Sequence, residues 1–168
     1  DTTLIEHSRH NVKRGIFIDL FPLDGAGNSK EEAIKALKPI YWRYQLVIAK
    51  TCAFNKNRAW YKNMALLICR CIPDFILNNN KLLFKIDKLC RKYDYDESKY
   101  IANFLGNWGS KEIVKKEVMG SPQLYSFENL SIYGAEKFDE YLTSLYGNWR
   151  KMPSKEKRVT HHDYVYLN

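Results

Sequence analysis

The alternation of apolar and polar residues predicts helices joined to a few short strands. The first clear apolar run is GIFIDLF, Gly15 to Phe21, which is typical of a strand buried on both faces. Asp19 interrupts the run, and a carboxylate there is costly unless it is paired, hydrogen-bonded or bound to a metal ion. Phe21-Pro22 ends the strand, and Asp24-Gly25 indicates a turn. The pattern therefore predicts one carboxylate on a strand and a second just beyond it.

Three helices are predicted after this turn. Ser29 and Glu32 match a capping box, and the apolar residues after them recur every three or four positions. Pro39 lies inside this helix, which predicts either a kink or two helices that meet there. The second helix, Arg58 to Ile72, is so apolar that it is either central to a helical layer or lies against a membrane surface. Because it lacks a strongly basic polar face, we favour the core.

The third predicted helix runs from Lys81 to Tyr93 and leads into Asp94-Tyr95-Asp96. Two carboxylates at this spacing can hold a divalent cation, but no apolar strand lies beneath them. We interpret the segment as a solvated turn.

The second half of the chain predicts short elements and one more helix. They are a strand at Tyr100–Leu105, a short helix at Lys111–Val114, a β-hairpin of Gln123–Phe127 and Leu130–Tyr133 around Glu128-Asn129, and a helix that ends at Gly147. Together the elements predict an α+β fold with a small sheet, a predominantly helical remainder and a C-terminal β-hairpin plus helix. We expect residues 1–168 to form a single domain.

Composition narrows the class of partner. The chain has 45% hydrophobic and 27% charged residues, as in a folded globular protein. Its net charge of +8 favours an anionic partner such as a nucleotide, a phosphate ester, an anionic lipid surface or a nucleic acid. No nucleic-acid fold signature accompanies the charge, so we expect no nucleic acid. No apolar run is long enough to predict a membrane span.

The four cysteines, Cys52, Cys69, Cys71 and Cys90, form no CxxC pair. Their neighbours are apolar or helical, which predicts buried, reduced thiols and argues against a zinc site or a disulfide framework.

Two stretches together resemble the LicD family of phosphotransferases, within the nucleotidyltransferase-fold superfamily. The first is GIFIDLFPLDG, residues 15–25. The second is YSFENLSIYGAEKFDEYLTSLYGNWRKMPSKEKR, residues 125–158, with an aromatic-Glu segment, a YLTSLYGNW helix end and a Pro-then-basic tail. The resemblance covers essentially the whole chain.

The resemblance implies a nucleotidyltransferase-like sheet and Mg²⁺-dependent transfer of a phosphorylated alcohol, phosphocholine or similar. The donor would be CDP-choline or another CDP-alcohol, and the acceptor a cell-surface glycan or lipid-linked glycan of the lipopolysaccharide, teichoic acid or capsule kind. Family members hold Mg²⁺ with an Asp-rich motif on an early strand and a carboxylate on a following strand. Asp19 matches the latter, as metal ligand and catalytic residue, and Asp24 matches the FPLD aspartate as a second catalytic residue.

The remaining assignments concern substrate contacts. Basic residues would bind phosphate oxygens and an aromatic ring would cover a choline ammonium by cation–π attraction. The assigned residues are Trp108, Glu128, Tyr146, Trp149, Arg150, Arg158 and His161. The Asp-rich motif and its glycine turn have no counterpart in this sequence. We therefore expect the chain to be the later two-thirds of a longer enzyme, working in the cytoplasm or at the inner face of the membrane.

Other interpretations stay open at this stage. The presence of Asp19 in an apolar strand is also explained if its carboxylate caps a neighbouring loop or pairs with an arginine. The chain as a whole is also explained as a non-catalytic module that binds an acceptor glycan or an anionic surface, with peripheral membrane association. Nucleic-acid binding rests on charge alone and would predict affinity that falls steeply with salt.

Overall fold

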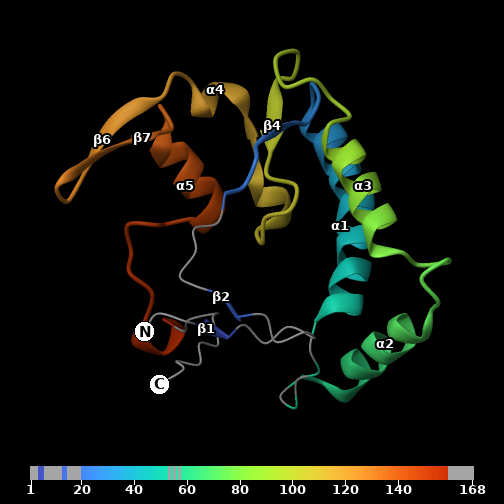
Figure 1. The fold of residues 1–168 in the computed structure, drawn as a ribbon. Helices are drawn as coiled ribbons and strands as arrows, with labels where there is room; N and C mark the ends of the chain where they lie inside the picture. The colour runs from blue at the N-terminus through green and yellow to red at the C-terminus, as the bar shows by residue number, and fades with distance from the viewer. Residues whose placement is uncertain are drawn as a thin grey trace. The chain divides into compact units, whose positions relative to one another are not determined.

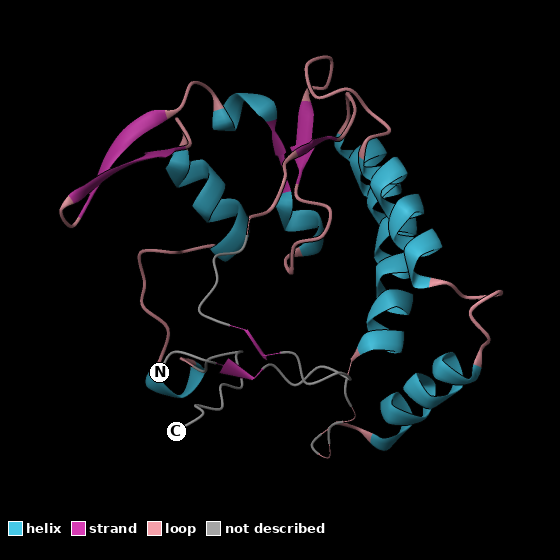
Figure 2. Ribbon diagram, in the orientation of Figure 1, coloured by secondary structure: helices cyan, strands magenta, loops and turns pink. Residues whose placement is uncertain are grey.

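The structure is a computed structural model that describes residues 4–5, 13–14, 20–52, 54, 56 and 58–158. Figures 1 and 2 show its helices and strands. In chain order the elements are β1 (Leu4–Ile5), β2 (Lys13–Arg14), β3 (Asp24–Gly25), α1 (Lys30–Thr51), α2 (Trp60–Cys71), α3 (Asn79–Cys90), β4 (Tyr100–Ala102), the 3₁₀ helix η1 (Gly109–Glu112), β5 (Ile113–Lys115), α4 (Lys116–Met119), β6 (Gln123–Phe127), β7 (Leu130–Gly134), α5 (Phe138–Tyr146) and the 3₁₀ helix η2 (Lys155–Lys157). Helices with small antiparallel sheets are consistent with the predicted α+β class.

The described residues fall into two compact units. Of the described residues, 4–5, 13–14, 20, those within 42–85, and 153–158 belong to the first unit, and 21–41 and 86–152 to the second. The helices α1 and α3 each contribute residues to both. The prediction of a single domain over 1–168 stays a prediction, as does the nucleotidyltransferase-like character of the sheet.

The sheet of the second unit has three antiparallel strands in the order β3-β4-β5. Asp24 pairs with Ala102, which pairs in turn with Ile113 on β5. The predicted turn at Asp24-Gly25 is therefore wrong, because a partner strand far along the chain overrides the local turn preference. Of the predicted strand, residues 15–19 lie outside the described part, and residues 20–23 form no strand, with Leu20 90% exposed.

The core of the second unit lies against this sheet. Ile101 and Val114, side by side on β4 and β5, pack with Val118 of α4, and all three are buried. Leu23, Met119 and Tyr141 cover the cluster. Cross-strand apolar pairs of this kind stabilise the sheet and fix its register.

The start of α1 is capped as predicted. The Ser29 Oγ accepts a hydrogen bond from the Glu32 N–H at 3.1 Å, and the Glu32 carboxylate accepts one from the Asn28 N–H at 2.8 Å. The helix then continues through Pro39 to Thr51 as one element. The predicted hairpin and the helix end at Gly147, where φ is 70°, are also confirmed. The predicted turn at Asp94–Asp96 is present, with the Asp94 Oδ1 accepting the Asp96 N–H at 2.7 Å.

Three predictions about local structure need correction. The strand that starts at Tyr100 ends at Ala102, and residues 113–115 form β5 and not the end of a short helix. All four cysteines are free thiols, but only Cys90 is buried and Cys71 is exposed. These errors share a cause, because apolar neighbours do not say which partner strand or face a residue will find.

The interpretation of α2 as a core helix is wrong. Of its twelve residues only Leu66 is buried, while Trp60 is 77% and Ile68 61% exposed. The apolar spacing correctly predicted a helix with one apolar face. Periodicity shows which residues share a face, and it does not show whether protein covers that face.

Lys50, near the end of α1, fixes the chain that follows α2. Its side chain is buried, and its Nζ donates to the Asp74 carboxylate at 2.5 Å and to the Leu77 carbonyl at 2.6 Å. We expect Lys50→Ala to lower the free energy of unfolding by about 2 kcal/mol, because it removes a buried ammonium group together with its charge-assisted hydrogen bonds to Asp74 and to the Leu77 carbonyl. Urea denaturation measures this. Lys85→Ala, at an exposed position of α3, is the control, and an equal loss there would contradict this role of Lys50.

Candidate functional site

Asp24 is the predicted catalytic residue that the structure describes best. It is half-buried on β3, paired across to Ala102. Burial raises the pKa of its carboxyl group above the ordinary value, Arg91 opposes that shift, and Asp87 adds to it. The strand thus holds an acid in a partly desolvated place, where its affinity for a proton is higher than in water.

Cys90, at the end of α3, lies in the electrostatic surroundings of Asp24. Burial raises the pKa of its thiol to about 11, and the charges of Asp24 and Asp87 act in the same direction, against Arg91. The thiol therefore keeps its proton at neutral pH and is unsuited to act as a nucleophile or a metal ligand. Of this pair, Asp24 stays the predicted catalytic group.

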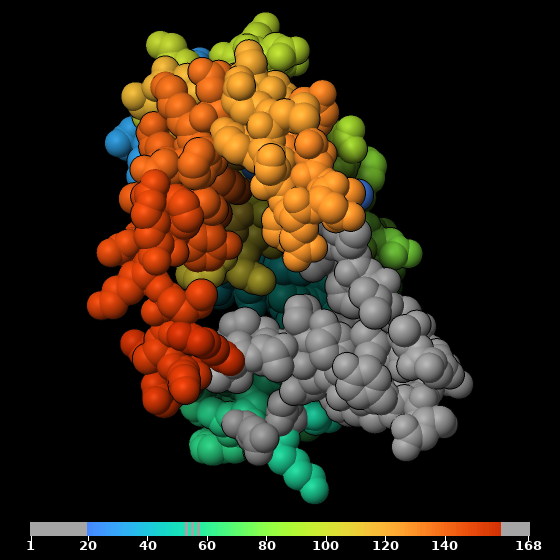
Figure 3. Space-filling view, turned by 90° about the vertical axis from the view of Figure 1, so that its left-hand side faces the viewer, coloured from blue at the N-terminus to red at the C-terminus, as the bar shows by residue number. Residues whose placement is uncertain are grey.

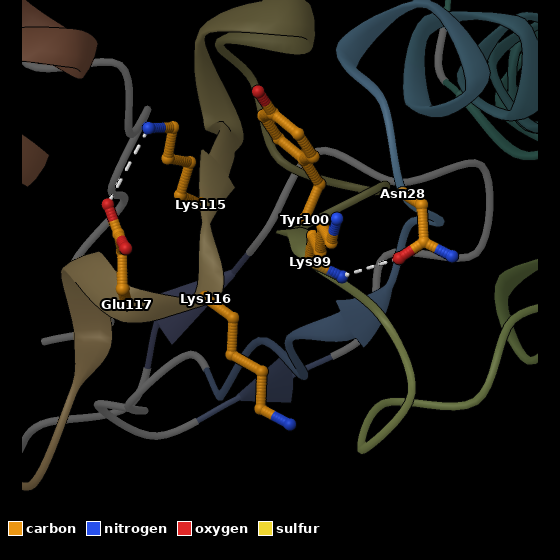
Figure 4. Close-up of a pocket in the computed structure, with 6 residues that line it drawn as sticks. All are labelled: Asn28, Lys99, Tyr100, Lys115, Lys116 and Glu117. Carbon is orange, nitrogen blue, oxygen red and sulfur yellow. Dashed lines mark hydrogen bonds and ion pairs between the residues drawn. The ribbon is translucent and has the colours of Figure 1, made fainter.

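A pocket of about 440 Å³ opens at the other end of the same strands (Figure 4). It is lined by Asn28, Lys99, Tyr100, Lys115, Lys116 and Glu117. Strand pairing brings these residues together: Tyr100 pairs with Lys115, and the Lys99 N–H donates to the Asn28 side chain at 3.3 Å. The volume suits a small-molecule ligand.

The pocket is predominantly cationic. Lys115 faces Glu117 at 3.6 Å, and the Nζ of Lys116 donates to the Tyr95 carbonyl at 3.0 Å. Among the residues that the structure describes, Lys99 has no ion-pair partner. Glu117 and Asp96, which pairs with Lys116 at 3.4 Å, offset two of the three lysines, so the charge of Lys99 is left in excess beside an aromatic ring. Such a lining attracts phosphate groups.

The register places Asp24 on the same face of the sheet as two residues of the pocket, Tyr100 and Lys115. Side chains in a cross-strand row share a face, and rows two residues apart share it too. Asp24, Ala102 and Ile113 form one row, and Tyr100 and Lys115 belong to the row two residues further along. Those rows are roughly 7 Å apart along the strands. This face of the sheet therefore carries an acid, an aromatic ring and one cation, Lys115, within the length of one small phosphorylated ligand.

Two of the predicted substrate-binding aromatics touch. The rings of Trp108 and Tyr146 meet edge to face, with their centroids 5.1 Å apart. The Lys111 Nζ lies 5.5 Å from the centroid of the Trp108 ring. A cation is thus already placed against the ring that was assigned to a choline ammonium. Both rings stay partly exposed, and their binding role stays a prediction.

Trp149 and Arg150 form a second group, at Asp139 of α5. The Trp149 indole N–H donates to the Asp139 carboxylate at 2.9 Å, and Arg150 pairs with the same carboxylate at 2.5 Å. The Arg150 guanidinium also lies over the Trp149 ring, 4.3 Å from its centroid. These contacts hold both side chains in place, and their assignment to substrate stays a prediction.

The other predicted residues are not brought to these groups by any described contact. Glu128 is exposed at the hairpin turn with φ of 52°, and the Arg158 Nε donates to the Pro153 carbonyl within the first unit. Asp19 and His161 lie outside the described residues. Among the residues that are described, no group of three or more His, Cys, Asp or Glu side chains suits a metal ion, so the predicted Mg²⁺ site rests on the resemblance.

Sequence reasoning missed the cationic pocket. Lys99 and Lys115 lie far apart in the chain, and only the pairing of β4 with β5 makes them neighbours. The Lys115-Lys116 doublet next to an apolar strand was the available signal. Without the strand register it could not be told from an ordinary solvated charge pair.

Comparisons with known proteins point in the direction of the resemblance. No family model matches the chain, and no solved structure matches it. The chain is similar to the lipopolysaccharide cholinephosphotransferase LicD of Haemophilus influenzae, with 23% identity over 154 residues. The match covers 89% of this chain and 56% of LicD, so the chain spans about half the length of the curated relative it matches. In sequence, the chain is LicD-like over most of its length.

Proposed function

We propose that the protein transfers a phosphorylated alcohol, phosphocholine or a similar group, from a CDP-linked donor to a cell-surface or lipid-linked glycan, with Mg²⁺ as cofactor. The observation that carries the proposal is the likeness to LicD along 89% of the chain. The cationic pocket supports it, and so does the half-buried Asp24, which shares a sheet face with Tyr100 and Lys115 of that pocket, because phosphoryl transfer depends on charge neutralisation and positioning.

In the proposed reaction, a hydroxyl oxygen of the acceptor forms a bond to the phosphorus that carries the alcohol. The anhydride bond to the CMP phosphate breaks, and CMP leaves with the bonding electrons. Lys99 and Lys115 neutralise the donor phosphates, and Tyr100 between them packs against the donor. Asp24 accepts the proton of the attacking hydroxyl, a task that a carboxylate with a raised pKa performs well. Bound Mg²⁺ supplies further charge neutralisation.

The pocket gives the first test of this proposal. We expect the double variant Lys99→Ala, Lys115→Ala to bind CDP about tenfold more weakly, because each substitution removes a charge-assisted contact to a phosphate group. Isothermal titration calorimetry with CDP and with cytidine measures it. Cytidine has no phosphate, so its binding should change little.

Lys88→Ala is the matched control, since Lys88 is an exposed lysine of α3 outside the pocket. It should bind CDP as the wild type does. Equal CDP affinity in the wild type and the double variant would remove the pocket from donor binding.

A second candidate function is non-catalytic binding of an acceptor glycan, and the β6–β7 hairpin favours it. Leu124, Phe127, Leu130 and Tyr133 are all exposed on it, and Figure 3 shows the hairpin residues in light orange at the surface. Exposed aromatic rings are suited to stacking on sugars. A glycan affinity that does not change when CDP or Mg²⁺ is added, with no CMP formed from the donor, would favour this candidate over the transferase.

A further inference from the structure

The positive charge of the chain is concentrated in one stretch. Between Glu32 and Asp74 there is no acidic residue, and the basic ones are Lys35, Lys38, Arg43, Lys50, Lys56, Arg58, Lys62 and Arg70. These eight equal the net charge of +8, so the rest of the chain has as many basic as acidic residues, 19 of each. A segment with this excess of one sign is attracted to an anionic surface.

Helix α2 lies inside this stretch and turns an apolar face to the solvent. Trp60, Tyr61, Met64, Leu67 and Ile68 are all exposed. At 100° per residue they fall on one side of the helix, while Leu66, the buried residue, falls on the other. An apolar side that faces outward, with aromatic residues at its start, is typical of a helix lying in a membrane interface.

The protein side of the helix is fixed by specific contacts. Arg70 donates to the Cys52 carbonyl and lies over the Phe54 ring, with 4.1 Å to its centroid. Lys50 holds the turn after α2 through Asp74 and Leu77. These contacts orient α2 with its apolar residues outward. The next turn adds two more exposed apolar side chains, Phe75 and Ile76.

No helix among the described residues is long and apolar enough to cross a membrane. We propose that α2 docks the protein on an anionic lipid surface, lying parallel to it. Trp60, Met64 and Ile68 enter the boundary between headgroups and acyl chains, and the excess of basic residues in this stretch of the chain attracts the anionic headgroups. The proposal does not depend on the transferase function, because vesicle binding is measured without donor or acceptor.

Co-sedimentation of the purified protein with vesicles tests the proposal. The vesicles are phosphatidylcholine alone, or two parts phosphatidylcholine with one part phosphatidylglycerol. We expect clear binding to the anionic vesicles, much weaker binding to the neutral ones, and a loss of binding at high salt. The double variant Trp60→Ser, Ile68→Ser should bind the anionic vesicles about tenfold more weakly or worse.

Phe127→Ser, Tyr133→Ser is the matched control, since it removes two exposed apolar side chains from the hairpin. It should bind vesicles as the wild type does. The α2 variant should keep the wild-type thermal midpoint in the absence of lipid. Equal binding to both vesicle types, no binding to either, or a large fall in that midpoint would overturn the proposal. A large fall in the thermal midpoint would show that other residues of the protein cover this face. A wild-type dimer in analytical ultracentrifugation that the α2 variant no longer forms would show that a second copy covers it.

Discussion

Asp24→Asn should lower the rate of CMP release from the CDP-linked donor by about a hundredfold or more, without weakening the fold. The substitution keeps the size and hydrogen-bonding groups of the side chain but removes the charge that accepts the proton. Losses of this size are usual when one positioned polar group is taken from a transfer site. Initial rates measured on the full-length protein test this.

The same substitution has a predictable effect on stability. Burial raises the pKa of Asp24, so the folded state holds this proton more tightly than the unfolded state does. The contribution of Asp24 to stability is therefore fully present at acidic pH, and it is lost as the pH rises through the raised folded-state pKa. Asparagine does not titrate. At neutral pH the thermal midpoint of Asp24→Asn should equal or slightly exceed that of the wild type.

Asp87→Asn is the control for both measurements. Asp87 carries a carboxylate near Asp24, but its own partner is Arg91, 2.8 Å away and just beyond the end of α3. It should retain most of the activity. Wild-type rates in Asp24→Asn, or a loss of activity that only follows unfolding, would remove Asp24 from the mechanism.

Gly25→Ala should lower the free energy of unfolding by about 3 kcal/mol, and the thermal midpoint by roughly 6–12 °C. A Cβ at this position would lie 2.6 Å from the carbonyl oxygens of both Tyr93 and Asp94. These are backbone atoms, so they can move only if β3 is displaced from its neighbours. Gly25 pairs with Ile101 on one side and bridges to Tyr93 on the other, so the whole edge of the sheet would shift.

Gly109→Ala is the comparison that separates this clash from a general cost of losing a glycine. Its φ is +56°, and a Cβ there would meet nothing within 4 Å. Only backbone strain opposes the substitution, about 1 kcal/mol. Differential scanning calorimetry should therefore give Gly25→Ala a thermal midpoint well below that of Gly109→Ala. The opposite order would mean that β3 is not held as the structure has it.

Local signals were sufficient for the elements that they specify completely. Ser29 and Glu32 marked the start of α1, and the hairpin around Glu128-Asn129 was found because both of its strands lie in one short segment. The LicD-like character of the chain also came from short motifs. In each case, residues close in sequence carry the whole interaction.

The pairing of strands far apart in the chain, and the solvent exposure of apolar faces, could not be predicted from the sequence. The Asp24-Gly25 pair is a turn by local preference and a strand only because β4 lies beside it. Lys99 and Lys115 become one pocket through the same sheet. Helix α2 carries an apolar face that periodicity detects, but its exposure depends on what the remainder of the fold covers.

The most direct test of the account follows both products of the proposed reaction. The full-length protein is incubated with Mg²⁺, a glycan acceptor and either CDP-choline or a CDP-linked polyol, and mass spectrometry follows CMP and the modified glycan. The account predicts equal amounts of CMP and of glycan carrying the phosphorylated alcohol with one of the donors, and neither product when the acceptor is omitted. Intact donor in every mixture, from a folded protein that still binds the glycan, would contradict it.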